Sequence, residues 1–96
     1  CPEKAITEVE RPIGIIETGT VKGRENITIT QGLLNIGEAM ATPLIEAVKE
    51  RAMEGVPAIV DSPPGTSCPV IASVDDADFV ILVTEPTPFG LHDLHL

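Results

Sequence analysis

The sequence predicts an α/β fold with a β-hairpin, one main helix and two parallel strands. Two short apolar runs, residues 58–61 and 79–84, lack polar alternation, which is typical of strands buried on both faces of a parallel sheet. The strictly alternating run 27–31 instead indicates a strand with one solvent-exposed face. Apolar residues at helical spacing occupy the stretch between these two kinds of strand.

The composition limits both the size of the core and the class of partner. The chain has 96 residues, 43% of them hydrophobic and only two aromatic, so we expect at most one small domain with an aliphatic core. A formal net charge of −9 disfavours nucleic acid and membrane surfaces as partners. No apolar run approaches the roughly 20 residues that span a bilayer. The two cysteines are too few for a disulfide framework, and we expect a cytoplasmic location.

Residues 13–36 are predicted to form the hairpin. Residues 13–18 and 27–31 supply its strands, and the polar, glycine-bearing stretch between them predicts a long loop. Glu38, which follows the hairpin, is interpreted as a surface residue in preference to a site residue.

The main helix is predicted to begin at Thr42, the N-cap, followed by Pro43 at the first helical position. Gly55 is expected to end it. Its polar face, which includes Glu46 and Lys49, is interpreted as solvent-exposed. Its apolar stripe is expected to face the core and consists of Met40, Leu44, Ile45, Val48, Ala52 and Met53.

The run Asp-Ser-Pro-Pro-Gly-Thr-Ser-Cys-Pro at residues 61–69 carries the candidate chemistry. Ligands of open α/β sheets lie beyond the carboxyl ends of strands, and Asp61 stands at such an end. A carboxylate followed by a glycine that permits close backbone approach suits Mg²⁺ and a phosphate. Pro69 predicts a short helix, and a crossover of this length makes the flanking strands parallel. A tight turn that binds nothing is the alternative.

The two ends of the sequence suggest a piece of a longer protein. Cys1 and Pro2, followed by Ile6, are similar to the end of a bacterial ferredoxin motif, which requires three earlier cysteines that these residues do not contain. An ordinary terminal thiol is the alternative. The other end, at Leu96, stops where a helix is expected to begin.

Residues 61–69, together with residues 83–94, resemble the MinD-like P-loop ATPases that carry an inserted ferredoxin domain, within the MinD/ParA/Mrp superfamily. The resemblance covers nearly the whole chain. It implies a partial Rossmann-like P-loop NTPase sheet with parallel strands. It also divides the chain into the tail of the ferredoxin insertion (1–10), the hairpin (13–36) and the ATPase core with its Walker B and switch-loop motif (42–96).

The resemblance implies roles for individual residues. Asp61 resembles the catalytic Walker B aspartate that holds Mg²⁺ through water. Gly65 resembles the switch-loop glycine whose N–H senses the γ-phosphate, and Thr66 and Ser67 lie where they add hydrogen bonds to phosphate or water. Two thiols have implied metal roles. Cys1 resembles the closing ligand of a [4Fe–4S] cluster. Cys68 is a candidate metal or redox ligand by loose analogy with nitrogenase iron protein, the alternative being a small buried thiol.

The implied function is ATP binding and hydrolysis, coupled in the whole protein to iron–sulfur electron transfer or cluster handling. A homodimer and an electron-transfer partner are the implied partners, with residues 84–86 near the dimer face. Because these 96 residues contain no glycine-rich, lysine-bearing phosphate loop, we expect them to be inactive alone. The alternatives are a non-catalytic acidic interaction or dimerisation module and an iron–sulfur electron carrier.

Overall fold

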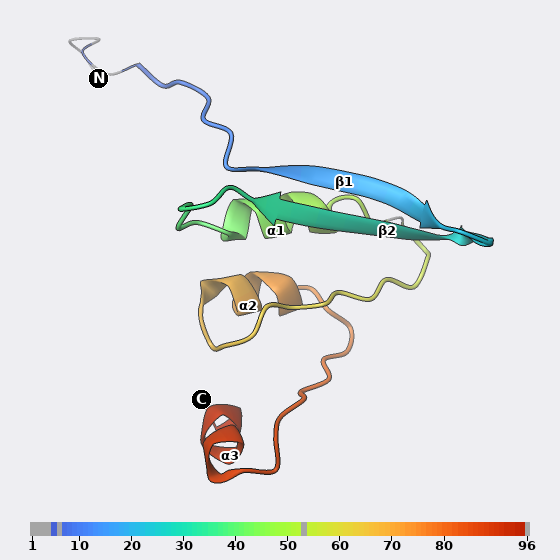
Figure 1. The fold of residues 1–96 in the computed structure, drawn as a ribbon, viewed down its shortest axis with the longest axis vertical. Helices are drawn as coiled ribbons and strands as arrows, with labels where there is room; N and C mark the ends of the chain where they lie inside the picture. Colours follow the sequence, from blue (N-terminus) through green and yellow to red (C-terminus); the bar gives the residue numbers. More distant parts are fainter. Residues whose placement is uncertain (1–4, 6, 53, 96) are drawn as a thin grey trace.

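The computed structural model describes residues 5, 7–52 and 54–95. A hairpin comes first and three short helices follow it, spread out in chain order with the last helix furthest from the hairpin (Figure 1). The elements are β1 (Gly14–Val21), β2 (Arg24–Leu34), α1 (Thr42–Lys49), α2 (Cys68–Val74) and α3 (Pro88–Leu94).

The antiparallel pairing of β1 and β2 confirms the predicted hairpin. Gly14 lies opposite Leu34, and a shift in register near the tip places Val21 opposite Arg24. Only Lys22 and Gly23 therefore connect the strands, and the predicted long loop is wrong. Gly23 has a φ of 77°, a left-handed conformation that glycine adopts without steric cost and that tight hairpin turns need.

Helix α1 covers one face of the hairpin and forms the small core with it. Leu44 is the buried apolar side chain, with 9% exposure. A Cβ added to Gly32 would lie 2.9 Å from Leu44 Cγ and 3.0 Å from Val48 Cγ2. The absence of a side chain on β2 at this position is therefore what lets the helix approach so closely.

The bounds of α1 differ from those predicted. Ala41 is the N-cap, and Thr42 is already helical. The helix ends at Lys49 and continues only as hydrogen-bonded turns to Ala52. Gly55 has the expected left-handed backbone, with a φ of 73°, but it lies beyond these turns. The helix is therefore shorter than the predicted apolar stripe: Met40 lies before it and is exposed, so its predicted place in the core is wrong, and Met53 lies outside the described residues.

The predicted parallel strands, and with them the partial Rossmann-like sheet, are wrong. Within the part of the chain that the structure describes, the sheet contains only β1 and β2. Residues 58–61 and 79–84 have no regular structure, and Ile59 and Val83 are 99% and 91% exposed. A strand forms only beside another strand about 4.8 Å away. Neither run has such a neighbour among the described residues.

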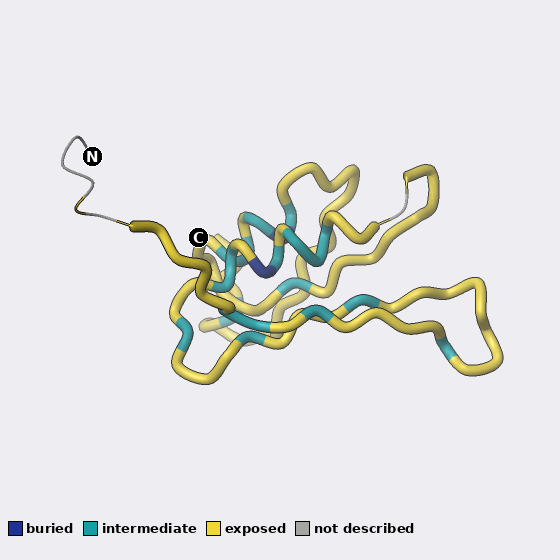
Figure 2. Tube along the Cα trace, turned by 90° about the horizontal axis from the view of Figure 1, so that it is seen from above, coloured by how far each residue is buried: buried dark blue, intermediate teal, exposed yellow. Residues whose placement is uncertain are grey.

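The molecule is open in shape. Its radius of gyration is 17.4 Å, whereas a compact chain of this length would have about 12.5 Å. Most of the chain is exposed, and the buried and half-buried residues lie mainly in α1, in α2 and at positions along the hairpin (Figure 2). None of the described helices has the length and apolar character needed to cross a bilayer.

Candidate functional site

The candidate site is the loop of residues 61–67, which runs exposed into the start of α2 and is called the 61–67 loop below. Pro63 and Pro64 restrict its backbone and remove two N–H donors. Gly65 follows with a φ of 109°, and a Cβ built on it would meet nothing within 4 Å. Its backbone is thus open to a ligand, and its conformation is one that other residues rarely adopt.

The loop ends in two hydroxyl side chains at the start of α2. Ser67 is the N-cap residue, with an extended backbone, and its side chain caps no helix N–H. Its carbonyl oxygen accepts from the N–H of Val70 at 2.9 Å. Within the described residues, the hydroxyls of Thr66 and Ser67 form no hydrogen bond to protein. Both side chains are therefore free to bind an external oxygen or water.

The residues with predicted metal roles do not form a group of metal ligands within the described part of the chain. Asp61 is exposed at the start of the loop. Cys68 is an exposed, free thiol at the first position of α2, so the alternative of a buried thiol is wrong. Cys1 lies outside the described residues. In the described ranges, no three His, Cys, Asp or Glu side chains come close enough together to hold a metal ion.

This arrangement fits Mg²⁺ held together with a phosphate. Mg²⁺ keeps several of its waters and usually takes few protein ligands besides phosphate oxygens, so a single carboxylate such as Asp61, acting through water, is compatible with such a site. An iron–sulfur cluster needs four ligands, nearly always thiolates. Cys68, the cysteine within the described ranges, does not meet that need.

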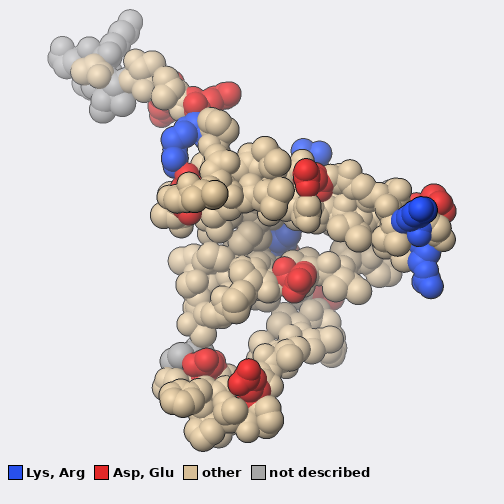
Figure 3. Space-filling view, viewed as in Figure 1, with Lys and Arg blue, Asp and Glu red and all other residues tan. Residues whose placement is uncertain are grey.

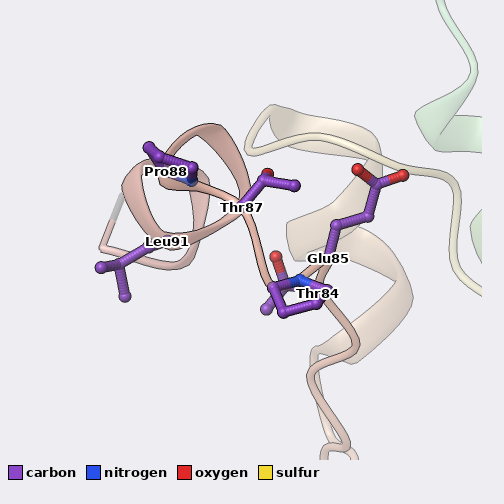
Figure 4. Close-up of a pocket in the computed structure, with 6 residues that line it drawn as sticks. Thr84, Glu85, Thr87, Pro88 and Leu91 are labelled. Atoms are coloured by element: carbon purple, nitrogen blue, oxygen red, sulfur yellow. The ribbon is translucent and has the colours of Figure 1, made fainter.

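The loop before α3 forms a second, self-contained cluster. The Thr84 hydroxyl donates to the Gly90 carbonyl oxygen at 2.9 Å, and the Gly90 N–H donates to Thr87 Oγ1 at 3.1 Å. A small surface hollow beside these hydrogen bonds is lined by Thr84, Glu85, Pro86, Thr87, Pro88 and Leu91. Figure 4 shows the side chains around this hollow.

Residues 84–86, for which the resemblance implies a place near a dimer face, do not follow a strand of a parallel sheet, because the sheet of the described residues contains only β1 and β2. Helix α3 packs against none of the other described helices or strands. The structure therefore does not bring the loop before α3 and the 61–67 loop into one site.

Glu38 is held more firmly than the sequence indicated. Its side chain is 6% exposed and pairs with Arg11 at 2.6 Å. One of its carboxylate oxygens also accepts from the Met40 N–H at 3.2 Å. The Met40 N–H, aided by Arg11, lowers the pKa of Glu38 below its ordinary value. This pair fixes the chain on both sides of the hairpin and lies apart from the 61–67 loop in sequence.

Lys49 is the residue that the sequence interpretation missed most clearly. Its ammonium group donates to the carbonyl oxygens of Ala72 at 2.8 Å and Asp75 at 2.5 Å, at the C-terminal end of α2. The prediction that this charge is only solvated is wrong. No local pattern could reveal this contact, because its partners lie more than 20 residues further along the chain.

Charge is distributed unevenly over the surface. Basic side chains gather at the far tip of the hairpin, whose turn contains Lys22, and other basic patches lie near the N-terminal segment and in the middle of the molecule, whereas the lower part of the visible face carries acidic patches alone (Figure 3). The 61–67 loop itself carries one carboxylate and no basic residue. A bound polyphosphate therefore needs cations from elsewhere.

Comparison with known proteins finds two archaeal relatives. The chain is 33% identical over 87 residues to uncharacterized protein MJ0578 of Methanocaldococcus jannaschii, a match that covers 88% of this chain. It is 35% identical over 71 residues, or 72% of the chain, to uncharacterized protein MJ0579 of the same organism. The matches cover 30% and 26% of the relatives, so the chain spans less than a third of their length. No protein-family model and no solved structure matches it.

Proposed function

We propose that these residues are part of a MinD-like P-loop ATPase with an inserted ferredoxin domain, and that the 61–67 loop contacts the phosphates of Mg–ATP. The observation that carries the proposal is the loop itself. It presents a carboxylate, an open glycine backbone and two unbonded hydroxyls in succession, all exposed, ahead of a helix. Its sequence resembles the switch loop of those ATPases.

Each side chain of the loop has a definite task in this proposal. Asp61 accepts hydrogen bonds from water on Mg²⁺, and the ion neutralises charge on the phosphates. The Gly65 N–H donates to the terminal phosphate, which approaches closely because no Cβ stands in its way. Thr66 and Ser67 orient phosphate oxygens or the attacking water. Loss of the terminal phosphate removes these contacts and releases the loop.

The remaining parts of the ATPase belong to other segments of the whole protein. The loop has no lysine for the phosphates, so we propose that these 96 residues do not turn over ATP alone. In the whole protein we propose that ATP hydrolysis is coupled to iron–sulfur electron transfer or cluster handling. The candidate cluster ligand, Cys1, lies outside the described residues, so no step is assigned to it.

The proposal is tested by Asp61→Asn in the intact protein. This change removes the charge but preserves shape, and it should lower Mg²⁺-dependent ATP turnover by about ten- to a hundredfold, as expected when a group that orients the water around a metal is lost. Asp78→Asn is the matched control, because Asp78 is an exposed aspartate outside the loop. Equal turnover in the two variants would contradict the proposal.

A second candidate function is a non-catalytic interaction or dimerisation module. The exposed apolar run 79–83 favours it, with Phe79 85% and Ile81 80% exposed, because contiguous apolar surface marks interaction sites. In that case Ile81→Lys would abolish self-association in analytical ultracentrifugation, and Asp61→Asn would have no effect on any activity of the protein. Under the ATPase proposal, Asp61→Asn impairs turnover whatever the oligomeric state.

A further inference from the structure

We infer that Lys49 is a positioning residue for the 61–67 loop and acts on it through α2. This inference rests on the proposed function, because it assigns a role in nucleotide binding to a residue that touches no nucleotide. Lys49 is the last residue of α1, and its ammonium group bridges to carbonyl oxygens at the end of α2.

The chemistry of this bridge is that of a helix cap supplied by another helix. The last carbonyl groups of a helix have no partner within it and carry partial negative charge, so a cation is favoured there. The last turn of α2 contains no basic residue of its own. Lys49 supplies the missing cation, and its contact with the Ala72 carbonyl is partly buried, which limits competition from water.

The two helices connect the loop to the core of the molecule. Helix α1 is fixed to the hairpin through Leu44 and Val48. Helix α2 contacts α1 but neither strand of the hairpin. Ser73 in α2 is 3% exposed, and its hydroxyl donates to the Pro69 carbonyl oxygen at 2.8 Å. Among the described elements, α2 therefore packs against α1, and the ammonium group of Lys49 donates the side-chain hydrogen bonds that join the two helices.

The position of α2 sets the position of the loop. Seven helical residues span about 10 Å, and the helix begins at Cys68, directly after the loop. Lys49 holds the far end of this rigid segment, so a displacement there moves the near end. The loss of Lys49 should thus weaken the binding of Mg–ATP while leaving the chemical step of bound ATP nearly intact.

The test compares Lys49→Met, Lys49→Arg and Lys22→Met in the intact protein. Met keeps the aliphatic length and removes the donor, whereas Arg keeps a cation and can still bond both carbonyls. Lys22, exposed in the hairpin turn, is the matched control. We expect Lys49→Met to raise the KM for Mg–ATP about tenfold with kcat within about twofold. Lys49→Arg should recover most of the loss, and Lys22→Met should have no effect.

Hydrogen exchange without nucleotide provides the second readout. Lys49→Met should speed amide exchange in residues 61–74 and leave the hairpin unchanged, which also shows that the variant is folded. If it does not fold, Lys49→Gln, which keeps one donor group, replaces it. Equal KM and exchange in Lys49→Met and Lys22→Met, with an active wild type, would overturn this inference alone. A wild type that neither binds nor hydrolyses ATP would overturn the proposed function as well.

Discussion

Two regions of this chain have similar apolar content but different structure. In residues 13–50, a hairpin and a helix bury Leu44 between them and come close enough that Gly32 has no room for a side chain. In residues 56–84, comparably apolar runs remain exposed, with Ile59 at 99%. The two regions differ because a second element lies beside the apolar residues of 13–50, whereas none covers the apolar runs of 56–84 among the described residues. Apolar residues form a core only where a second element lies beside them.

The candidate site and the core lie in different regions of the chain. The 61–67 loop belongs to the open region but is linked to the packed one through α2 and Lys49. Such a loop has few contacts that oppose movement, and regions that bind ligands are commonly of this kind. The 61–67 loop shares the exposure of such regions.

The largest effect is expected from truncating the core. Leu44→Ala should destabilise the 96-residue chain by about 2–4 kcal/mol, because it leaves a cavity between α1 and the hairpin. Ile81→Ala, at an exposed apolar site in the open region, should change stability by less than about 0.5 kcal/mol. Urea denaturation followed by circular dichroism measures both. Equal losses would mean that residues 79–84 are packed in solution, which would remove the distinction between the two regions.

A smaller effect, on the pH dependence of stability, is expected at Glu38. The Met40 N–H and Arg11 hold the pKa of this carboxylate below its ordinary value in the folded state. Its contribution is therefore present above the unfolded pKa of about 4.3 and is lost as the pH falls through the lower folded value. Glu38→Gln should flatten the acid side of the stability curve.

The control for this prediction is Glu46→Gln, at an exposed position of α1. Thermal unfolding of both variants and the wild type between about pH 3 and pH 7 makes the comparison. An acid dependence in Glu38→Gln as steep as in the wild type and in Glu46→Gln would show that the contacts with Met40 and Arg11 do not stabilise the fold.

Local patterns predicted the local structure well. The alternation at residues 27–31 correctly predicted β2, and Pro69 correctly predicted a short helix, α2. The two-residue turn was missed, although Gly23 beside Lys22 is itself a turn signal. Apolar spacing correctly selected Leu44 as a core residue. These features depend on residues a few positions apart, so a single sequence contains them.

Features that depend on distant neighbours were not predictable. An apolar run such as 79–84 shows a tendency to be buried, but it does not show which element will lie beside it, and the parallel sheet was therefore wrong. The contacts of Lys49 with α2 and of Glu38 with Arg11 join residues more than 20 positions apart. At residues 61–69 the sequence correctly predicted a loop followed by a short helix, while the role of this loop as a binding site stays a prediction.

The central claim is that the 61–67 loop binds the phosphates of Mg–ATP. The most direct test is a titration of the intact protein with Mg–ATP, followed through amide NMR shifts. The account predicts saturable shifts at Gly65, Thr66 and Ser67, much smaller shifts with ATP in the absence of Mg²⁺, and none at the hairpin tip around Gly23. Binding or turnover of ATP without any shift in the 61–67 loop would contradict it.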